Sequence, residues 1–507
     1  MRQKIQSIEN LTNIVLKGKK KGKKIVLCHG VFDLLHIGHI KHFNRAKSYG
    51  DLLVVSVTCD KYVNKGPYRP AFNEQHRLEA IQALDAVDFV VLSKYPSATN
   101  LINELKPNVY CKGKDYKNIA EDITGEIKKE IKAIKKVGGK IIFTQDITFS
   151  SSKIINNFGN IYPSQHKSII NRVKKKYSIK KINKLIEDFK KLKVLVIGET
   201  IIDQYFFCET LGKSGKEPIL VLRDLKSERY LGGAGAICRH LSSFSKQITL
   251  LSMVGEKGEQ IKEIKKKLPK NVDFKYIKKF GSPTIIKKRF LDHLSFHKIF
   301  GVDSVNDDFL NKKNEKSFFK LLKVNLLKHD LIIVSDYGHG LISDKSASLI
   351  SKLSKYLALN AQVNAANVGY HSMSKYKNLD CLIVNEKELR HEMRDKKNKI
   401  ESLMKKFAMQ QNIKDVVATQ GVTGSLLYNK KNNHFNYCQA FAKNAIDKVG
   451  AGDSMLSLIA LCLKSKFDKN LAMLISSLGA AQSVKSIGNK EALNKIKIFK
   501  AISHLLK

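Results

Sequence analysis

Residues 29–39 decide how the N-terminal part of the chain folds. They read His29-Gly30-Val31-Phe32-Asp33-Leu34-Leu35-His36-Ile37-Gly38-His39. The apolar run Ile25–Cys28 predicts a buried strand before them, and apolar residues at helical spacing follow from Ile40 onward. His36 and His39 therefore stand at a strand-to-helix junction, where the N–H groups and positive dipole end of a helix favour a phosphate. Both imidazoles can donate hydrogen bonds to a phosphoryl group, so we expect them to be catalytic.

The pattern Gly30-x-Phe32-Asp33-x-x-His36-x-Gly38-His39 resembles the signature of the cytidylyltransferase-type nucleotidyltransferases. Class I aminoacyl-tRNA synthetases share the His-x-Gly-His, and Met373-Ser374-Lys375 imitates their second signature, but the residues before His36 favour the first family. Further matches stand at Arg69-Pro70, Lys112–Tyr116 and Ser150–Lys153. The resemblance implies that the nucleotide is bound by Gly30, Phe32, Asp33, Gly38, Arg77, Lys112, Gly113, Asp115, Ser151 and Ser152.

Apolar runs alternate with helical segments through the same part of the chain. The expected strands are residues 25–28, 51–57, 86–92, 108–111 and 140–143. Strands and helices in alternation predict a doubly wound parallel sheet, with ligands at the carboxyl ends of the strands. We therefore expect a Rossmann-like α/β nucleotidyltransferase domain over residues 1–160.

A lysine-rich stretch separates this domain from a second α/β series. Residues 163–193 hold few strand formers and one amphipathic helix near Ile182–Phe189. The apolar run Lys193–Gly198 then starts the second series. We expect a basic linker and helix over 161–192 and a second α/β domain over 193–507.

Two glycine-rich segments mark the second domain. Leu231-Gly232-Gly233-Ala234-Gly235-Ala236 enters one helix, and Asp447-Lys448-Val449-Gly450-Ala451-Gly452-Asp453-Ser454 opens another, apolar one. Glycines at a helix start offer N–H groups to a charged phosphoryl, and Asp453 can take the proton of a hydroxyl. These parts suit phosphoryl transfer, in which positioning and electrostatics do most of the work.

Residues 193 to about 500 resemble the ribokinase-like (phosphofructokinase-B) sugar kinases. Ser335–Gly338, Asn385–Glu388 and Thr419-x-Gly421-x-x-Gly424 also match. The resemblance implies that Asp453 is the base and that Asn385 and Glu388 lie near Mg²⁺ and the phosphates. The residues implied near ATP are Thr419, Gly421, Gly424, Gly450 and Gly452. Those implied near the sugar are Asp203, Gly232, Gly233 and Arg289. No metal ligand set is assigned. Ala236 replaces the family's sugar-binding Asn, and Val449 replaces a Thr.

Composition narrows the function classes. The chain has 507 residues, of which 43% are apolar, enough for sizeable cores. No apolar run reaches the roughly 18 residues of a membrane span, and the eight cysteines form no Cys-x-x-Cys pair. We expect a cytoplasmic protein that needs no membrane. The net charge of +45 is spread along the chain, so we expect no specific nucleic-acid partner, although an RNA-binding protein is the third function class considered.

The two resemblances together are similar to the bifunctional heptose 7-phosphate kinase/heptose 1-phosphate adenylyltransferases, with the domain order reversed. They imply a bifunctional sugar-phosphate kinase and sugar 1-phosphate nucleotidyltransferase that makes an ADP-heptose-like nucleotide-sugar for lipopolysaccharide or capsule. The implied cofactors are Mg²⁺ and ATP, with ATP or CTP as nucleotidyl donor, and the expected assembly is a homodimer. The alternative is a cytidylyltransferase that acts on a polyol phosphate and carries a degenerate, sugar-binding kinase-like module. The sequence leaves open the sugar, the base and the activity of the kinase half.

Overall fold

The computed structural model describes residues 4–117, 125–144, 156, 162–363, 367–442 and 445–507. Its contacts divide the chain into two compact units. The first comprises Met1–Lys167 together with Ile496–Lys507, and the second comprises Ser168–Lys495. The sequence analysis had placed residues 193–507 in one domain, whereas the contacts group 496–507 with the first unit.

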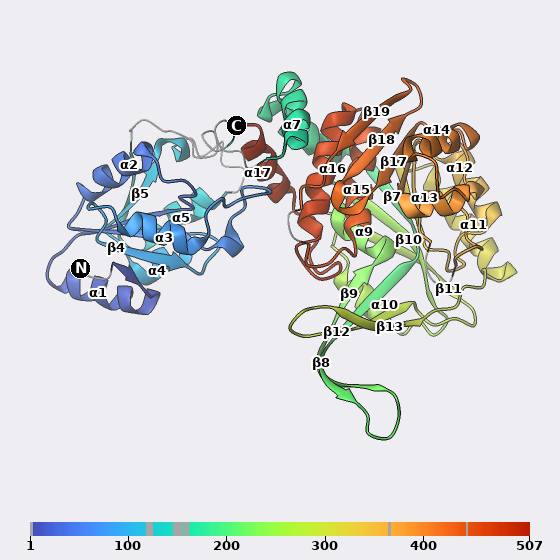
Figure 1. Cartoon of the computed structure of the whole chain (residues 1–507), viewed down its shortest axis with the longest axis horizontal. Helices are drawn as coiled ribbons and strands as arrows, with labels where there is room; N and C mark the ends of the chain where they lie inside the picture. The colour runs from blue at the N-terminus through green and yellow to red at the C-terminus, as the bar shows by residue number, and fades with distance from the viewer. Residues whose placement is uncertain (1–3, 118–124, 145–155, 157–161, 364–366, 443–444) are drawn as a thin grey trace. The chain divides into compact units, whose positions relative to one another are not determined.

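A parallel sheet forms the middle of the first unit (Figure 1). In spatial order its strands are β1 (Ile5–Gln6), β4 (Phe89–Ser93), β3 (Leu52–Thr58), β2 (Ile25–Gly30), β5 (Val109–Gly113) and β6 (Lys140–Thr144). The helices of this unit are α1 (Ile8–Lys20), α2 (Ile37–Lys47), α3 (Glu74–Gln82), α4 (Thr99–Leu105) and α5 (Glu126–Lys136). Separate apolar clusters pack against the two faces of the sheet, which explains why β2 and β3 are almost continuously apolar.

The order of the strands fixes where a ligand can bind. β2 lies between β3 and β5, so the chain leaves the middle of the sheet in opposite directions on the two sides of β2. In doubly wound sheets such a switch point opens a crevice at the carboxyl ends of the strands. His29 and Gly30 end β2 at this position, so the strand runs past the expected end at Cys28.

The second unit contains a mostly parallel sheet of nine strands. In spatial order they are β11 (Val272–Lys279), β10 (Gln247–Gly255), β7 (Lys193–Gly198), β14 (Leu331–Asp336), β15 (Leu357–Ala361), β16 (Cys381–Asn385), β17 (Asp415–Thr419), β18 (Ser425–Asn429) and β19 (His434–Cys438). The antiparallel pairs of this sheet are β17 with β18 and β18 with β19. Both units thus confirm the predicted doubly wound α/β class.

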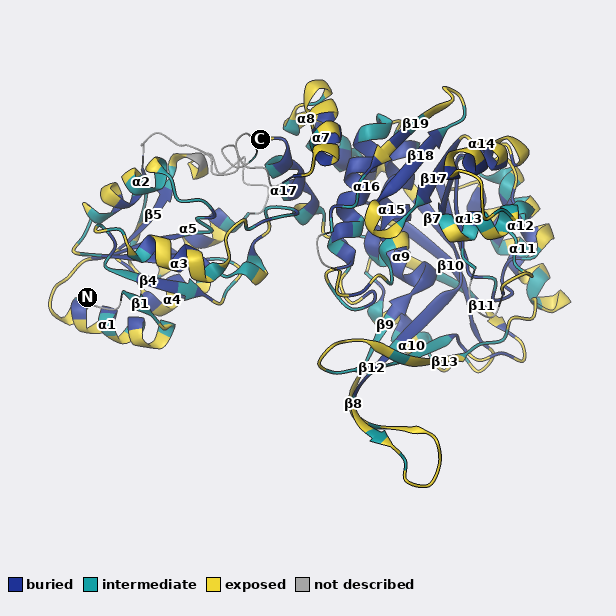
Figure 2. Ribbon diagram, viewed as in Figure 1, coloured by how far each residue is buried: buried dark blue, intermediate teal, exposed yellow. Residues whose placement is uncertain are grey.

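Helices cover this larger sheet. They are α8 (Ile179–Glu187), α9 (Gly233–Leu241), α10 (Ile261–Lys267), α11 (Lys312–Leu326), α12 (Asp344–Leu353), α13 (Glu386–Met393), α14 (Ile400–Gln410), α15 (Ala451–Lys464) and α16 (Lys469–Ser483). Two further helices, α7 (Ser164–Lys176) and α17 (Lys495–Leu505), lie where the chain passes from one unit to the other. The inner strands of the sheet, such as β7, β14 and β15, and most of α15 and α16 are buried, whereas the edge strands β11 and β19 are partly exposed (Figure 2).

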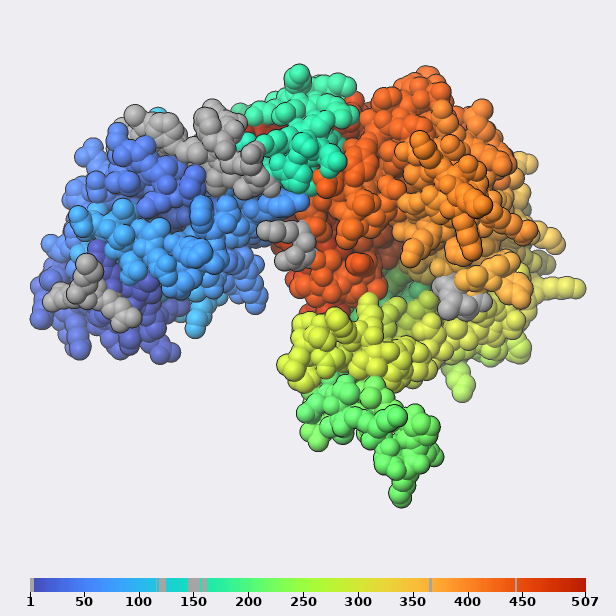
Figure 3. Space-filling view, viewed as in Figure 1, coloured from blue at the N-terminus to red at the C-terminus, as the bar shows by residue number. Residues whose placement is uncertain are grey.

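A separate four-stranded sheet extends from one side of the second unit. Its order is β13 (Lys298–Ser304), β12 (Ile286–Asp292), β8 (Thr200–Lys213) and β9 (Leu220–Gly232). The far part of the β8–β9 hairpin projects from the rest of the unit as an exposed arm (Figures 2 and 3). The sequence analysis did not foresee this sheet, because β9 and β13 are rich in charged residues and lack the apolar runs that marked the buried strands.

No helix among the described residues combines the length and the apolar character that crossing a membrane requires. The eight cysteines are all free thiols.

Candidate active sites

His36 and His39 lie together at the start of α2. His36 is the N-cap, and its Nδ1 accepts a hydrogen bond of 3.1 Å from the N–H of Gly38. The two imidazole rings stack with their centroids 3.9 Å apart. Burial holds the pKa of His39 at about 3, with His36 and Lys65 adding to the effect, and burial also lowers the pKa of His36. Both rings are therefore neutral at pH 7 without a ligand.

The loop between β2 and α2 is shaped by two residues of the signature. Phe32 adopts a left-handed φ of 50°, which brings its ring edge-on to His39 at 5.3 Å. A Cβ on Gly30 would lie 2.9 Å from the Phe32 ring, so a side chain does not fit there. Gly30 and Phe32 thus set the position of His39 by packing.

Asp33 and Arg77 hold this loop through bonds to the protein. The buried Asp33 carboxylate pairs with Arg69 at 2.8 Å and accepts from the N–H groups of Ala71 and Phe72 at 2.6 and 3.2 Å.

Arg77 is buried as well. Its guanidinium donates to the carbonyls of Phe72, Val31 and Thr58 at 3.0, 2.6 and 2.9 Å, and to the Asp60 carboxylate at 2.5 Å. In this geometry both residues act on the shape of the site.

The end of β5 supplies the opposite wall of the site. The buried Lys112 Nζ donates to the His29 carbonyl at 3.3 Å and lies 3.4 Å from the Glu130 carboxylate. Gly113 follows it, and a Cβ there would meet nothing within 4 Å, which leaves room for a ligand. Of the remaining expected residues, Ser151 and Ser152 and the side chain of Asp115 lie outside the described residues.

His29 is a third histidine in this region, and the sequence analysis did not assign it a role. It is buried at the end of β2, and its ring nitrogens lie 3.0 Å from Ser56 Oγ and 3.4 Å from Thr58 Oγ1. Burial, helped by Lys112, holds the pKa of His29 at about 3. Its position directly after an apolar strand was the available signal, but a buried histidine in a hydrogen-bonded core has the same sequence pattern.

In the second unit, Asp453 lies in the first turn of α15 with its carboxylate buried. Gly450 caps this helix at a φ of 83°, and a Cβ on it would lie 2.1 Å from Asn489 Oδ1. Gly452 faces open space, so its backbone is accessible to a ligand. Burial raises the pKa of Asp453 to about 7; the hydroxyl of Tyr337, which donates to Oδ1 at 3.1 Å, opposes this rise.

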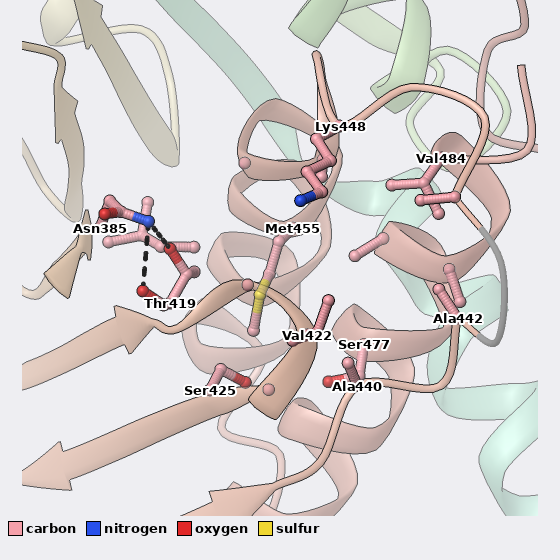
Figure 4. A pocket seen from close by; sticks show the side chains of 18 of the residues that line it. Asn385, Thr419, Val422, Ser425, Ala440, Ala442, Lys448, Met455, Ser477 and Val484 are labelled. Atoms are coloured by element: carbon pink, nitrogen blue, oxygen red, sulfur yellow. Dashed lines mark hydrogen bonds between the residues drawn. The ribbon is translucent and has the colours of Figure 1, made fainter. Parts of the chain in front are cut away.

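A pocket of about 340 Å³ opens beside this helix start (Figure 4). It brings together the expected Asn385, Glu388, Thr419, Gly421, Gly424 and Gly452. Its other walls are apolar, from Ile383, Val422, Met455 and Val484, with Lys448 at one side. Apolar walls with a few polar groups suit a nucleotide base and its sugar.

Asn385 and Glu388 are held at the start of α13 by a capping box. The Asn385 N–H donates to Glu388 Oε2 at 2.8 Å, and the Asn385 amide donates to the Thr419 carbonyl at 3.3 Å. Burial raises the pKa of Glu388. Asn360, also in the wall of the pocket, has a buried Oδ1 with no hydrogen-bond partner among the described residues.

Next to Asp453, charged residues from the four-stranded sheet surround Asp203. Arg289 on β12 pairs with the buried Asp203 carboxylate, and the Lys287 Nζ lies 5.8 Å from the centre of the Tyr337 ring. A Cβ on Gly232 would lie 2.2 Å from Asp203 Oδ2, and one on Gly233 would lie 2.3 Å from the Glu199 carbonyl. The glycines thus allow the carboxylate to approach the start of α9.

Two further residues of this site were missed. Tyr337 contacts the Asp453 carboxylate, although the sequence analysis had used it only as a family match. Glu199 is fully buried and accepts from the N–H groups of Tyr337 and His339 at 3.0 and 3.3 Å. Burial and then Asp336 raise the pKa of Glu199 to about 7. A glutamate directly after the first apolar strand was the only signal in the sequence.

The synthetase-like reading of Met373–Lys375 finds no support in the fold. These residues form a short turn of helix in the second unit, whereas the two histidines belong to the first. Lys375 pairs with the buried Asp336 at 2.7 Å. Lys375 therefore has a structural role in the second unit.

Both sites place titratable groups at a helix start, and the site of the second unit also has a pocket with apolar walls. Residues 191–495 match the family described as pfkB family carbohydrate kinase, and residues 27–157 match the cytidylyltransferase-like family. The first match covers more than half of the chain, which therefore belongs to the pfkB carbohydrate kinase family. The nucleotidyltransferase-type domain precedes the kinase domain, as the sequence analysis expected.

Relatives named as bifunctional proteins match part of the chain. "Bifunctional protein HldE" of Geobacter metallireducens is 40% identical over 156 residues, which are 30% of each protein. The protein of the same name from Campylobacter concisus is 41% identical over 139 residues, 27% of this chain and 29% of the relative. The chain thus matches less than a third of the length of these relatives, in its N-terminal part.

Solved structures are similar over the second unit. Phosphofructokinase-2 from Escherichia coli, in complex with substrates and products, is 15% identical, with a TM-score of 0.49 over 62% of this chain and 100% of that one. Ribokinase from Arabidopsis thaliana, complexed with ribose and ATP, is 16% identical, with a TM-score of 0.47 over 62% of this chain and 99% of that one.

Proposed function

We propose that the chain is a bifunctional enzyme that makes an activated nucleotide-sugar. The kinase unit would phosphorylate a sugar phosphate at its anomeric hydroxyl, and the first unit would join the sugar 1-phosphate to a nucleoside monophosphate. The resemblance described in the sequence analysis implies an ADP-heptose-like product for surface polysaccharide, and relatives named "Bifunctional protein HldE" match the N-terminal part of the chain. The observation that carries the proposal is the presence in one chain of a buried base at a helix start and of paired histidines at another.

In the kinase reaction, the sugar hydroxyl attacks the terminal phosphorus of ATP, and ADP leaves. The Asp453 carboxylate takes the proton of the hydroxyl, for which a pKa of about 7 suits neutral pH. The free N–H groups at the start of α15 face the transferred phosphoryl. Lys287 and Arg289 give the sugar side a positive field, which favours a substrate that already carries a phosphate.

Mg²⁺ fits the residues on the nucleotide side of this site. Glu388 offers a carboxylate, and the unpartnered Asn360 Oδ1 offers a further oxygen in the same pocket wall. Magnesium in such sites is bound by one or two protein oxygens, substrate phosphates and water. When bound, it neutralises charge on the phosphates, while Asn385 keeps the Glu388 carboxylate oriented.

In the nucleotidyltransferase reaction, a phosphate oxygen of the sugar 1-phosphate attacks the α-phosphorus of the nucleotide, and the bond to pyrophosphate breaks. His36 and His39 can donate to the phosphoryl oxygens as charge builds up there. Lys112 places a positive charge beside the end of β2. ATP or CTP are both acceptable donors on this chemistry.

The test is one assay of the full chain with separate detection of ADP and pyrophosphate, using ATP and CTP against a panel of sugar phosphates. Asp453→Asn keeps the shape of the side chain but cannot act as the base. We expect sugar-dependent ADP formation to fall by about 10²–10⁴. Supplying the sugar 1-phosphate directly should restore nucleotide-sugar formation. Wild-type kinase turnover in Asp453→Asn would contradict the assignment of the base.

One observation favours the alternative function. Ala236, fully buried, presents no polar group to a sugar, and Asp203 is already paired with Arg289. If the wild type forms pyrophosphate from CTP and a polyol phosphate but no ADP with any sugar, the kinase unit is a degenerate sugar-binding module. We also propose a cytoplasmic homodimer, which light scattering of the purified chain would test.

A further inference from the structure

Helix α17 packs against the loop that borders the two histidines, although it is encoded after the whole kinase unit. Gly66, in the loop between β3 and α3, has a φ of 91°. A Cβ on Gly66 would lie 3.1 Å from the Cα and 3.3 Å from the Cβ of Ala501. The backbone of the helix and the loop therefore touch, and Ala501 is buried by this contact.

Hydrogen bonds continue from the helix to the catalytic loop. Asn156 donates from Nδ2 to the backbone carbonyl of His504 at 2.6 Å, and its Oδ1 accepts from Arg69 Nη2 at 3.2 Å. Arg69 in turn pairs with the buried Asp33 at 2.8 Å. Asp33 lies in the loop just before the N-cap His36. The side chains of Asn156 and Arg69 therefore connect α17 to the catalytic loop.

Positive charge gathers at the same place. The half-buried Lys65 lies within electrostatic reach of Arg69, Arg77 and Lys507. Two carboxylates belong to the same group, because Asp33 pairs with Arg69 and Asp60 pairs with Arg77. His504 is also within reach of Lys65, Lys500 and Lys507. Lys65 acts on His36 and His39, which places the group beside the catalytic pair. Such an excess of cations favours a ligand with several negative charges.

We propose that residues 496–507 complete the nucleotidyltransferase site: α17 positions the loop of residues 65–70, and the resulting cationic wall binds the phosphates of the substrates. The identity of the bound phosphates rests on the proposed function. Ala501 and Asn156 are positioning residues, because they act through Gly66 and Arg69. The kinase unit contains none of these contacts, so its activity serves as an internal control.

The test is Ala501→Met in the full chain, with Ile496→Met as the matched control. Both variants place a methionine on α17. Ile496 is exposed and close to methionine in volume, whereas the larger side chain at position 501 has no room against Gly66. Displacing a substrate-binding loop by about 1 Å can cost 10²-fold in rate. We expect Ala501→Met to raise KM for the sugar 1-phosphate at least tenfold with a smaller change in kcat, and to weaken pyrophosphate binding measured by calorimetry. ADP formation and the control variant should stay at the wild-type level.

Asn156→Ala provides a second route that leaves the helix packing intact, and it should raise the same KM while Asn156→Gln restores part of the effect. Unchanged KM and unchanged pyrophosphate binding in both variants, with wild-type thermal unfolding, would overturn the proposal. Pyrophosphate binding does not depend on turnover. If the wild type transfers no nucleotide but binds pyrophosphate, and Ala501→Met weakens that binding, the proposed function fails and this inference stands. A wild type that binds no pyrophosphate contradicts the cationic wall.

Discussion

Removing the Tyr337 hydroxyl should shift the pH dependence of the kinase reaction. In wild type this hydroxyl donates to the Asp453 carboxylate at 3.1 Å in a fully buried setting and lowers the pKa of that carboxyl, which burial otherwise raises. Tyr337→Phe removes the donor that stabilises the charged form. The pKa of Asp453 must therefore rise, and the ionised base is then available only at higher pH.

The size of the shift follows from the energy of the bond. A hydrogen bond to a charged group contributes about 1.5–3 kcal/mol, and about 1.4 kcal/mol corresponds to one pH unit. The wild-type pKa of Asp453 is about 7. If this pKa rises by roughly one to two, the ionised fraction of the carboxyl at pH 7 falls from about a half to between about a tenth and a hundredth. We expect kcat/KM at pH 7 to fall about 5-fold to 50-fold, and to approach the wild-type value near pH 9–10.

The assay is ADP formation from pH 5.5 to 10 with the best sugar phosphate. Tyr428→Phe is the matched control, because Tyr428 is equally buried but its hydroxyl donates to Asn433. It should leave the profile unchanged. A Tyr337→Phe profile with the wild-type midpoint and a uniformly lower rate would refute the reasoning, since it would show that Tyr337 acts on packing alone.

Three further predictions concern other parts of the two sites. Gly232→Ala would place a methyl group 2.2 Å from Asp203 Oδ2, so we expect KM for the sugar to rise at least tenfold with ATP affinity preserved; an unchanged KM would remove Asp203 from the sugar site. His36→Ala or His39→Ala should lower the rate of pyrophosphate release by roughly 10²–10³-fold and leave ADP formation intact. Normal nucleotidyl transfer in these variants would show that the two histidines have only a structural role at the start of α2. Burial holds the pKa of His29 at about 3, so its stabilising contribution is complete above pH 6.5 and is lost as the pH falls. His29 alone should account for about 2 kcal/mol of the stability that the first unit loses in urea unfolding between pH 7 and pH 5. His29→Gln, which does not titrate, should lose less by about that amount, whereas an equal loss in both proteins would contradict the role of His29.

The buried strands could be predicted because both faces of a parallel strand are apolar. β7 spans Lys193–Gly198, the same residues as the expected run, and β2 contains the expected Ile25–Cys28. The strands of the exposed arm could not be found this way. β9 is held in the arm by its pairing with β8, and no local pattern in the sequence of β9 reveals that pairing.

Residue types and spacing indicated the pocket but not the network around it. Asn385, Glu388 and Thr419 lie together because β16 and β17 are neighbours in the sheet, a relation that the order of motifs implied. The hydrogen bond from Tyr337 to Asp453 joins residues far apart in the chain, and no spacing rule connects them. Arg77 shows the reverse: its charge suggested a ligand, and its burial among backbone carbonyls became visible only in the fold.

Because residues 496–507 belong to the first unit, the unit whose synthesis starts first is completed last. Domains generally fold as the ribosome delivers them, the N-terminal one first. Here the unit that begins first receives its last helix only after the second unit has been translated. A chain cut short by premature termination or by cleavage near residue 495 would then keep a kinase and lose a finished nucleotidyltransferase. Translation would thereby ensure that the second unit is complete before the first one is.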